Sequence, residues 1–448
     1  MEENYNNKPL LLVTLIILFL IAISFLGEFN FGKLRIKKID FFADIRKDTI
    51  ENYEKNLENL LKENTINVNN TVNSIDEDSF AVYQNNYSYV YLQKFWKSLK
   101  DEEYNLKPIH IAYFGDSEIE GDLITSDLRY LIQEKFGGSG VGFLPLSSVD
   151  AEFRNQVSFK FDEENIQITS LNKTNKNYDY GISGAVFEPI SDFTVKYIIH
   201  NNQSNFDILR VFYKISDSTS TPYFYINKNK IEIIAKDEHL SQYVTDIKIN
   251  TKQLEFIFPA NQSKFYGISL EQRKGIYVDN FSLRGYSGAT LDLIPIENLK
   301  RFNKFMNYRL IILQYGMNVL SDEIKNYTYY KMKMINVIKH FKKAFPDADI
   351  LIISVGDKGK KIGNKYITDA NIFNLIKSQK ELAEETNVSF INLYDLMGGF
   401  NTIVNWVSKG YAAPDYVHLN RSGAKIIAKK IFDIISNYNY KITSVVGN

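Results

Sequence analysis

Short, nearly continuous apolar runs separated by helical patterns constrain the fold of this chain more than any other feature. The runs are "IHIAYF" (109–114), "RLIILQ" (309–314), "DILIISV" (349–355) and "SFINL" (389–393). Runs of this length suit parallel strands that helices cover on both faces. The helical patterns between and after them lie near 321–344, 370–386 and 421–436. Strands alternating with helices predict an α/β domain built on a doubly wound parallel sheet.

The interval 145–282 interrupts this series with a different pattern. Short alternating runs such as "VSFKF", "FTVKYII" and "LEFIFP" are separated there by Asn, Ser, Asp and Gly turns, which is typical of an all-β unit. The interruption comes after one strand and one helix, so the simplest architecture is a β-sandwich inserted into an α/β domain. We therefore expect the α/β domain to comprise 81–144 and 283–440, with the sandwich at 145–282.

The N-terminus predicts a membrane segment. The stretch 10–27 is apolar apart from two hydroxyl side chains, and at about 1.5 Å per residue it can just cross a hydrocarbon core. We expect a signal-anchor within 1–30 and a stalk or linker at 31–80, with a cleaved signal peptide as the alternative. Basic residues follow at positions 33, 35, 37 and 38, and by the positive-inside rule they favour a cytoplasmic location for that flank.

Composition excludes several kinds of site and partner. The chain has no cysteine, which excludes disulfides, cysteine-ligated metals and a thiol nucleophile. Lys plus Arg and Asp plus Glu both total 53, so there is no overall basic field to hold nucleic acid. The 30 Tyr and 31 Phe favour β-structure and are compatible with a sugar-binding surface.

One serine stands where the first apolar run gives way to a helical pattern, in "YFGDSEIEGD" (113–122). Open α/β folds keep their sites at this carboxyl edge of the sheet, where helix N-termini present unpaired amides. Ser117 could there attack a carbonyl carbon while its own N–H holds the resulting oxyanion. The alternative is an N-cap serine, with Glu120 three residues later completing a capping box. The segment alone leaves both interpretations open.

The last part of the chain supplies an aspartate and a histidine at a spacing suited to general base catalysis. In "APDYVHLNRSG", Asp415 precedes His418 by three residues, just before the last amphipathic pattern. On a short loop, that spacing lets the carboxylate reach Nδ1 of the imidazole, which leaves Nε2 free to take a hydroxyl proton. None of the other histidines has an aspartate three residues before it.

Two further strand ends offer hydrogen-bond donors for an oxyanion. The run at 309–314 leads into "YGMN", which places Asn318 at the same edge of the sheet. "RGYSGATLD" supplies Gly285 where the α/β pattern resumes, and Gly288 is the alternative if the motif is registered one turn later. An Asn amide and a glycine N–H are suitable donors, although both residues are also common in strand-ending turns. Together, features in this order at predicted strand ends favour a serine hydrolase.

These blocks resemble the SGNH/GDSL hydrolases over about 105–435. The matching blocks are "GDS" with Ser117, "GYSG" with Gly285, "GMN" with Asn318, and "DYVH" with Asp415 and His418. The resemblance implies a three-layer α/β/α domain in which Ser117 is the acyl nucleophile, His418 the general base and then acid, and Asp415 its orienting carboxylate. It also implies an oxyanion hole formed by the Ser117 amide, the Gly285 N–H and the Asn318 side chain, with no metal and no cofactor.

The wider pattern is similar to the bacterial peptidoglycan O-acetylesterases. "GDSEIEGDLIT", "FGGSGVGFLPL" and "GIYVDNFSLRGYSGATLD" flank the β-rich interval, which the resemblance implies is a jelly-roll resembling a carbohydrate-binding module. The sequence departs from the family where Glu118 follows the serine. We expect a serine esterase that removes O-acetyl groups from a cell-envelope polysaccharide, first of all peptidoglycan, through an acetyl-serine intermediate. A polysaccharide O-acetyltransferase with the same triad and a non-catalytic glycan-binding protein are the alternatives.

The expected substrate also implies a location. We expect a single-pass protein of the inner (cytoplasmic) membrane with its catalytic domain on the periplasmic side, in conflict with the basic flank after the membrane segment. Its expected partners are the O-acetylated polysaccharide and the membrane, with no nucleic acid. The sequence identifies no protein partner.

Overall fold

The computed structural model describes residues 88–100 and 107–437, with short gaps in the second range, and a few isolated residues before them. The gaps lie at 150, 153, 175, 201–204, 216–221, 234–238, 249–250 and 261–262, and the earlier described residues are 29–31, 34–36, 55 and 83–85. Chain contacts divide the protein into two units, 1–63 with 361–365, and 64–360 with 366–448. The second unit holds all the predicted site residues.

The predicted membrane segment at 10–27 and nearly all of the predicted stalk at 31–80 lie outside the described residues, so both stay predictions. In the part of the chain that the structure describes, no helix combines the length and the apolar character needed to span a membrane. Two short hairpins form two-stranded sheets of their own. They are β1 (Phe29–Phe31) with β2 (Leu34–Ile36), and β20 (Gly359–Ile362) with β21 (Lys365–Thr368).

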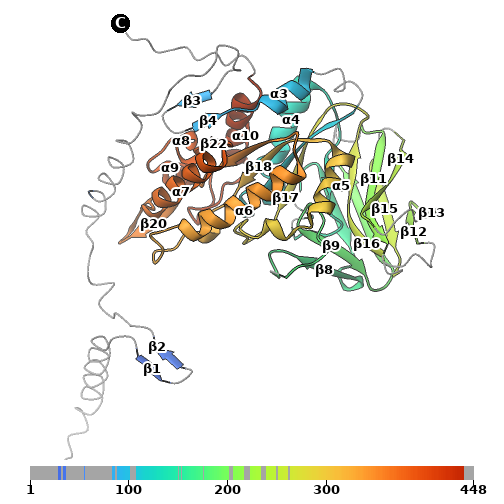
Figure 1. The fold of residues 1–448 in the computed structure, drawn as a ribbon, viewed down its shortest axis with the longest axis horizontal. Helices are drawn as coiled ribbons and strands as arrows, with labels where there is room; N and C mark the ends of the chain where they lie inside the picture. The colour runs from blue at the N-terminus through green and yellow to red at the C-terminus, as the bar shows by residue number, and fades with distance from the viewer. Residues whose placement is uncertain are drawn as a thin grey trace, which may run out of the picture. The chain divides into compact units, whose positions relative to one another are not determined.

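A seven-stranded sheet with a parallel centre organises the α/β part of the chain (Figure 1). Its order is β17-β5-β18-β19-β22-β4-β3. The strands from β17 to β22 in that order run parallel, and β4 and β3 continue the sheet antiparallel. The bounds are β17 (Ile276–Ser282), β5 (Ile109–Gly115), β18 (Tyr308–Gln314), β19 (Asp349–Ile353), β22 (Ser389–Ile391), β4 (Ser88–Val90) and β3 (Tyr83–Asn85). The predicted α/β fold with a parallel sheet is thus confirmed.

Strand β5 shows why a continuous apolar run forms the centre of this sheet. All its residues are buried, because successive side chains point to opposite faces and helices cover both. Tyr113 joins the core beneath α4 (Thr125–Phe136) and α10 (Arg421–Ile435). The next side chain, Phe114, contacts Phe341 of α6 on the other face, with ring centroids 5.2 Å apart. Burying one such side chain stabilises the fold by roughly 1.5–3 kcal/mol.

The remaining helices complete the two outer layers and the connections between strands. They are α3 (Gln93–Lys100), α5 (Ile296–Met306), α6 (Thr328–Ala344), α7 (Asn371–Thr386), α8 (Leu393–Met397) and α9 (Thr402–Ser408). Short 3₁₀ turns are η3 (Ser117–Asp122), η4 (Glu163–Asn165), η6 (Leu291–Leu293) and η7 (Met317–Val319). Two of these turns, η3 and η7, directly follow the carboxyl ends of the neighbouring strands β5 and β18.

Two antiparallel sheets are built from the chain between β6 and β16, drawn in green and yellow in Figure 1. One has the order β13-β12-β15-β10-β7, and the other has the order β14-β11-β16-β9-β8, with β6 paired to β16. Phe159 and Phe256 of the first sheet share one apolar core with Val211 and Ile268 of the second. The two sheets therefore pack face to face as a sandwich.

The strands of this sandwich are short, and several of them, including β10, β12 and β15, have alternating burial. The first sheet comprises β13 (Asn229–Glu232), β12 (Tyr223–Ile226), β15 (Gln253–Phe258), β10 (Phe193–Ile199) and β7 (Val157–Phe161). The second comprises β14 (Ser241–Asp246), β11 (Ile208–Ile215), β16 (Ser263–Glu271), β9 (Ala185–Pro189), β8 (Ile166–Ser170) and β6 (Gly142–Leu144). In β10 every second residue is buried, which is the pattern of a strand with one face on the core.

The edge strand β17 corrects the predicted end of the insert. Its residues fall within the predicted range 145–282, yet they pair in parallel with β5, from Ile276 opposite Ile109 to Ser282 opposite Gly115. A local apolar pattern shows that a strand forms but not which sheet it joins. The predicted boundary at 282 is therefore one strand too late.

A buried charge cluster joins the sandwich to the parallel sheet at His110, the second residue of β5. Its Nδ1 lies 2.8 Å from Asp279 Oδ2 of β17, and its Nε2 lies 3.0 Å from Glu271 Oε2 at the end of β16. Arg210 of β11 also bonds to Glu271, and Tyr308 of β18 donates to Asp279 at 2.8 Å. Complete burial opposes a charged imidazole, but the two carboxylates outweigh it and raise the pKa of His110 to about 9.

The charged state of His110 makes stability depend on pH in a defined window. The unfolded side chain loses its proton near pH 6.5, whereas the folded one keeps it up to about pH 9. Its contribution to the free energy of unfolding, roughly 3 kcal/mol, is therefore complete below the lower pH and disappears as the pH rises through the higher one. His110→Gln should remove this slope, which denaturant unfolding across the pH range would measure.

The matched control for this variant is His340→Gln. The His340 ring bonds to the backbone carbonyl of Ile294, at 2.8 Å, and not to a carboxylate. This variant should therefore keep the wild-type slope. Equal slopes for the wild type and His110→Gln would contradict a charged His110 in the folded protein.

Candidate active site

Gly115 and Asp116 shape the turn that presents Ser117. At Gly115, the end of β5, an added Cβ would lie 2.9 Å from the Ile119 side chain, so glycine lets the turn close against the strand. Asp116 is the N-cap of η3, and its Oδ1 accepts a hydrogen bond from the N–H of Glu118 at 3.1 Å. The alternative interpretation of Ser117 as the N-cap is therefore wrong, because the preceding aspartate fills that position.

The helical segment that begins at Ser117 is shorter than the sequence predicts. The turn η3 has six residues, and its backbone leaves helical geometry at Glu120 and Gly121, before α4 begins at Thr125. Ser117 thus opens a 3₁₀ turn and not the amphipathic helix itself. As the first residue of that turn, it has an N–H with no acceptor inside the turn.

The structure brings Ser117, His418 and Asp415 into one hydrogen-bonded chain. Ser117 Oγ lies 2.9 Å from His418 Nε2, and His418 Nδ1 lies 2.7 Å from Asp415 Oδ2. Because Nδ1 faces a carboxylate, it carries the proton, and Nε2 is left as the acceptor for the serine hydroxyl. The serine and the histidine are 301 positions apart, so only the tertiary fold can produce this arrangement.

A short loop before α10 fixes the aspartate and the histidine. Asp415 Oδ1 accepts hydrogen bonds from the backbone N–H groups of Val417 at 2.9 Å and of His418 at 3.1 Å. A bridge between Ala412 and Leu419 closes the loop. Partial burial opposes ionisation of Asp415, but the His418 ring and these backbone bonds outweigh it and hold its pKa below the ordinary value. The carboxylate is therefore ionised beside the imidazole at neutral pH.

Gly285 and Gly288, the two candidates for a backbone donor, differ in their surroundings. Gly285 has a φ of +71°, and no atom lies within 4 Å of the position that its Cβ would take. A Cβ at Gly288 would lie 2.6 Å from the ring of Tyr315, so that glycine serves packing. The turn before Gly285 is tied to the nucleophile's strand by a bond from the Leu283 N–H to the Gly115 carbonyl, at 2.9 Å. These surroundings favour Gly285 as the residue that faces a ligand.

Asn318 joins the site through its side-chain amide. Its Nδ2 donates to Asp116 Oδ2 at 2.8 Å and to the Tyr286 carbonyl at 3.2 Å. Both hydrogens of the Asn318 amide are thus in use. To donate to an oxyanion, the amide would break its longer bond, to the Tyr286 carbonyl, and form a new bond to the oxyanion. Asp116 connects the nucleophile turn with the end of β18, a role that the sequence analysis missed. Its signal was an Asp directly before the helical pattern, since Asp is a favoured N-cap.

Glu118, which departs from the family pattern, is buried beside the nucleophile. Its side chain is 7% exposed, its Oε1 has no hydrogen-bond partner among the described residues, and it lines a small void with Gln314 and Tyr315. Burial, with the nearby carboxylates of Asp116 and Asp415, raises the pKa of Glu118 to about 8. The side chain is therefore protonated and neutral at pH 7.

The other polar groups of the described chain do not repeat this arrangement. Ser158 Oγ lies 2.8 Å from His200 Nε2 in the sandwich, but no carboxylate among the described residues bonds to the His200 ring. The described residues also contain no group of three His, Asp or Glu side chains placed to hold a metal ion.

The fold and this hydrogen-bonded chain define a class of structure, an α/β domain with a serine–histidine–aspartate relay at the carboxyl edge of a parallel sheet. In fold, the protein resembles the SGNH/GDSL hydrolases. A solved structure of a peptidoglycan O-acetylesterase superposes with a TM-score of 0.65 at 19% sequence identity, over 77% of this chain and 95% of that chain. This likeness is one of fold.

Other solved structures overlap less. An acetyl xylan esterase matches 36% of this chain and 82% of its own at 16% identity, with a TM-score of 0.25. A family two carbohydrate esterase from Cellvibrio japonicus matches 63% of this chain and 98% of its own at 8% identity, also with a TM-score of 0.25. These scores are too low to support an argument. No family model and no curated protein matches the sequence.

If Glu118 is neutral in the folded protein, its contribution to the free energy of unfolding should fall as the pH rises. A salt-bridged acid would have the opposite effect. The unfolded side chain loses its proton near pH 4.5, while the folded one keeps it to about pH 8. The unfolded state thus binds fewer protons in this window, and stability is lost as the pH rises. Glu118→Gln, which is isosteric and uncharged, should flatten this part of the curve of unfolding free energy against pH.

The exposed Glu134 on α4 offers a matched substitution, Glu134→Gln, that should follow the wild-type curve. The difference between the two variants isolates the buried carboxyl from other titrating groups. If Glu118→Gln lost stability with the wild-type slope, Glu118 would have to be ionised in the folded protein.

Proposed function

We propose that this protein is a serine esterase that removes O-acetyl groups from a polysaccharide. Ser117 is the nucleophile, His418 is the general base and then the acid, and Asp415 orients the imidazole. The observation that carries this proposal is the hydrogen-bonded chain from Ser117 Oγ to Asp415 Oδ2. A serine that only caps a helix, or a histidine with only a structural role, does not need this hydrogen-bonded relay. Acyl transfer by a serine does need it.

In the first half-reaction, Ser117 Oγ attacks the acetyl carbonyl carbon as its proton passes to His418 Nε2. The resulting imidazolium is stabilised by the ionised Asp415. The negative oxygen of the tetrahedral intermediate is held by the N–H groups of Ser117 and Gly285 and by the Asn318 amide. The C–O bond to the sugar then breaks, and the sugar oxygen takes the proton from His418 to leave as an alcohol.

In the second half-reaction, water replaces the sugar. His418 Nε2 accepts a proton from the water as its oxygen attacks the acetyl-serine carbonyl, and it returns that proton to Ser117 Oγ as the ester bond breaks. Acetate is released, and the serine hydroxyl is restored. An O-acetyltransferase would share the first half-reaction and use a sugar hydroxyl in place of water in the second.

A polysaccharide substrate is supported by the fold that this chain shares with a peptidoglycan O-acetylesterase. The sandwich beside the α/β domain gives the protein a second surface on which a polymer can lie. We place a cell-envelope polysaccharide first among the candidates, with peptidoglycan as the glycan to be tested. The reaction that these side chains perform requires only an accessible acetyl ester and water.

The proposal includes a place of action. An envelope substrate requires the catalytic domain to lie outside the cytoplasmic membrane, anchored through the apolar stretch 10–27. A reporter enzyme fused to the C-terminus tests this part separately. Activity of a reporter that works only in the cytoplasm would overturn the proposed location without affecting the proposed chemistry.

The nucleophile is tested by Ser117→Ala. This change should abolish release of acetate from p-nitrophenyl acetate and from O-acetylated peptidoglycan, because it removes the hydroxyl that is hydrogen-bonded to His418 Nε2. Ser158→Ala is the matched control, since Ser158 also bonds to a histidine ring, His200, and it should retain activity. Wild-type rates in Ser117→Ala would disprove the esterase. Following free and transferred acetate with an acceptor sugar present would separate hydrolysis from transfer.

The oxyanion donor is tested by Asn318→Ala. Loss of one such donor costs about 2.7–4 kcal/mol of barrier, so kcat should fall roughly a hundredfold or more while KM changes little. The exposed Asn405 on α9 supplies the control variant Asn405→Ala, which should behave as wild type. A change confined to KM would assign Asn318 to substrate binding instead.

A further inference from the structure

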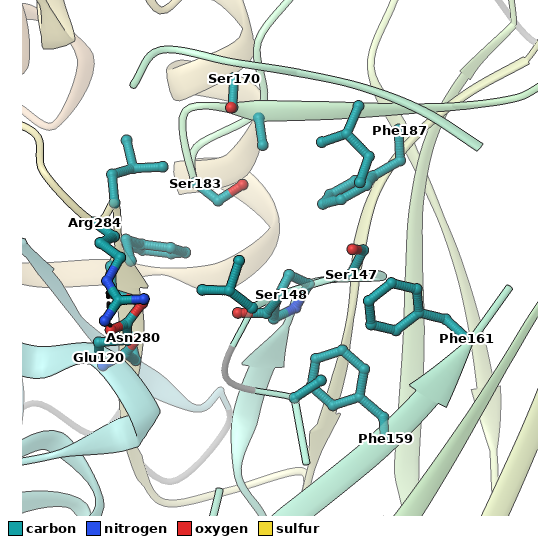
Figure 2. Close-up of a pocket in the computed structure, with 18 of the residues that line it drawn as sticks. Glu120, Ser147, Ser148, Phe159, Phe161, Ser170, Ser183, Phe187, Asn280 and Arg284 are labelled. Carbon is teal, nitrogen blue, oxygen red and sulfur yellow. Dashed lines mark ion pairs between the residues drawn. The ribbon is translucent and has the colours of Figure 1, made fainter. Parts of the chain in front are cut away.

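The two sides of the candidate site are held in place by different contacts. On the side of the nucleophile, Glu120 of η3 pairs with Arg284, which directly precedes Gly285, at 3.3 Å. This ion pair is dashed in Figure 2, and it joins the turn of the nucleophile to the turn of the candidate backbone donor. The loop that carries the aspartate and the histidine is supported from another part of the chain, and a strained residue in that loop shows where.

Tyr416, which directly follows Asp415, has a left-handed backbone conformation with a φ of +59°. A bulky residue seldom adopts such a φ, and it does so only where the surrounding contacts fix it. The turn at Tyr416 brings the N–H groups of Val417 and His418 back to Asp415 Oδ1, at 2.9 and 3.1 Å. The strain therefore lies between the two residues whose hydrogen bond orients the imidazole.

Two residues from β20 and β21 hold Tyr416 in this conformation. The ring of Tyr366 in β21 stacks on the ring of Tyr416, with centroids 3.7 Å apart and an angle of 9° between the ring planes. The N–H of Gly359, the first residue of β20, donates to the Tyr416 carbonyl at 2.8 Å. A Cβ at Gly359 would lie 2.7 Å from the Tyr416 Cβ, so this close approach needs a glycine. All three residues belong to the same unit of the chain.

These two supporting residues are themselves anchored to the α/β domain. Thr368, at the end of β21, donates its N–H to Asn401 Oδ1 at 3.0 Å, and its Oγ1 accepts from the Asn401 N–H at 2.7 Å. The N–H of Asp369 donates to the Lys358 carbonyl at 2.7 Å, which closes the base of β20 and β21. Thr368 and Asp369 are buried. The contacts on Tyr416 therefore come from a fixed base.

We propose that Tyr366 is a positioning residue for the candidate active site, because its ring keeps Tyr416 in the conformation that aligns His418 with the serine. The inference rests on the proposed function and adds to it a residue that acts through another. Without the stacked ring, Tyr416 would be free to leave its left-handed conformation. The N–H groups after it would then move away from Asp415, and the imidazole would lose its orientation. A poorly aligned base lowers kcat and leaves the binding of a small ester unchanged.

The first test measures hydrolysis of p-nitrophenyl acetate. Tyr366→Ala should lower kcat about tenfold with KM within about twofold of the wild type, and Tyr366→Phe, which keeps the stacked ring, should restore kcat. Gly359→Ala, whose Cβ would displace Tyr416, should lower kcat similarly and keeps the test decisive if Tyr366→Ala folds poorly. The control is Tyr329→Ala on α6, where the side chain is 69% exposed and both constants should stay unchanged. An unchanged kcat in both test variants, or a change confined to KM, would overturn the proposal.

Substitutions of Tyr416 separate its ring from its backbone. Tyr416→Ala loses the stack and keeps the unfavourable φ, whereas Tyr416→Gly loses the stack but adopts a positive φ readily. The kcat of Tyr416→Ala should therefore be about threefold below that of Tyr416→Gly. The double variant of Tyr366→Ala with Tyr416→Ala should match Tyr416→Ala alone, because both changes remove the same contact. A lower kcat in the glycine variant, or effects that multiply in the double variant, would contradict the proposal.

Hydrogen exchange separates this inference from the proposed reaction, because it requires no turnover. Amide exchange in the peptide 411–420 should be about tenfold faster in Tyr366→Ala than in the wild type, and unchanged in Tyr329→Ala. If the wild type hydrolyses no ester but this difference is found, the esterase proposal fails and the role of Tyr366 stands. If hydrolysis depends on Ser117 while Tyr366→Ala matches the wild type in kcat and exchange, the role of Tyr366 fails and the esterase stands. In an active enzyme, a change in only one of the two measurements would also overturn the inference.

Discussion

Parallel pairing of β5 between β17 and β18 is the constraint on which the candidate site depends. The three strands end at one edge of the sheet, and each leads into a different part of the site. β5 leads to Ser117, β17 to the turn of Gly285, and β18 to Asn318. Because the strands run in the same direction, residues far apart in the sequence arrive together without long loops. Loss of β17 from the sheet would displace the turn that carries the candidate backbone donor.

The carboxyl groups beside the serine show how hydrogen bonds, and not burial alone, decide protonation. Asp116 accepts from the Glu118 N–H and the Asn318 amide, and these bonds limit the effect of burial, so that its pKa rises only to about 6. Glu118 is equally enclosed and has an oxygen without a partner in the described structure, and its pKa rises to about 8. At neutral pH the first is mostly ionised and the second is neutral. The negative charge of Asp116 is thus stabilised by the Glu118 N–H and the Asn318 amide.

This division matters for the proposed reaction. An ionised Asp116 keeps Asn318 in place beside the serine, so the charge positions a donor. A second charge on Glu118 would lie in the same low-dielectric region and oppose the oxyanion of the tetrahedral intermediate. When Glu118 is protonated, its side chain can lie beside the serine without repelling the negatively charged intermediate. The relay from Ser117 to Asp415 is therefore supported by two buried acids in different protonation states.

The sequence predicted the parts of the site that depend on local spacing. Asp415 and His418 lie on one short loop, and Ser117 lies where an apolar run ends, so their chemistry could be inferred from neighbouring residues. The cap at Asp116, the buried position of Glu118 and the second bond of Asn318 depend on contacts between strands. For the same reason the sequence assigned β17 to the inserted sandwich, because an apolar pattern does not identify the strand with which it pairs.

The buried cluster around His110 lies at the junction of the sandwich and the parallel sheet. His110 and Asp279 lie on β5 and β17, while Glu271 and Arg210 belong to the sandwich, so the cluster fastens the two parts together. Two cations and two carboxylates balance in charge, which limits the penalty of burying them. His110 stands near the amino end of β5, whereas Ser117 follows its carboxyl end. The cluster therefore fixes the sandwich at the amino end of these strands, away from the nucleophile.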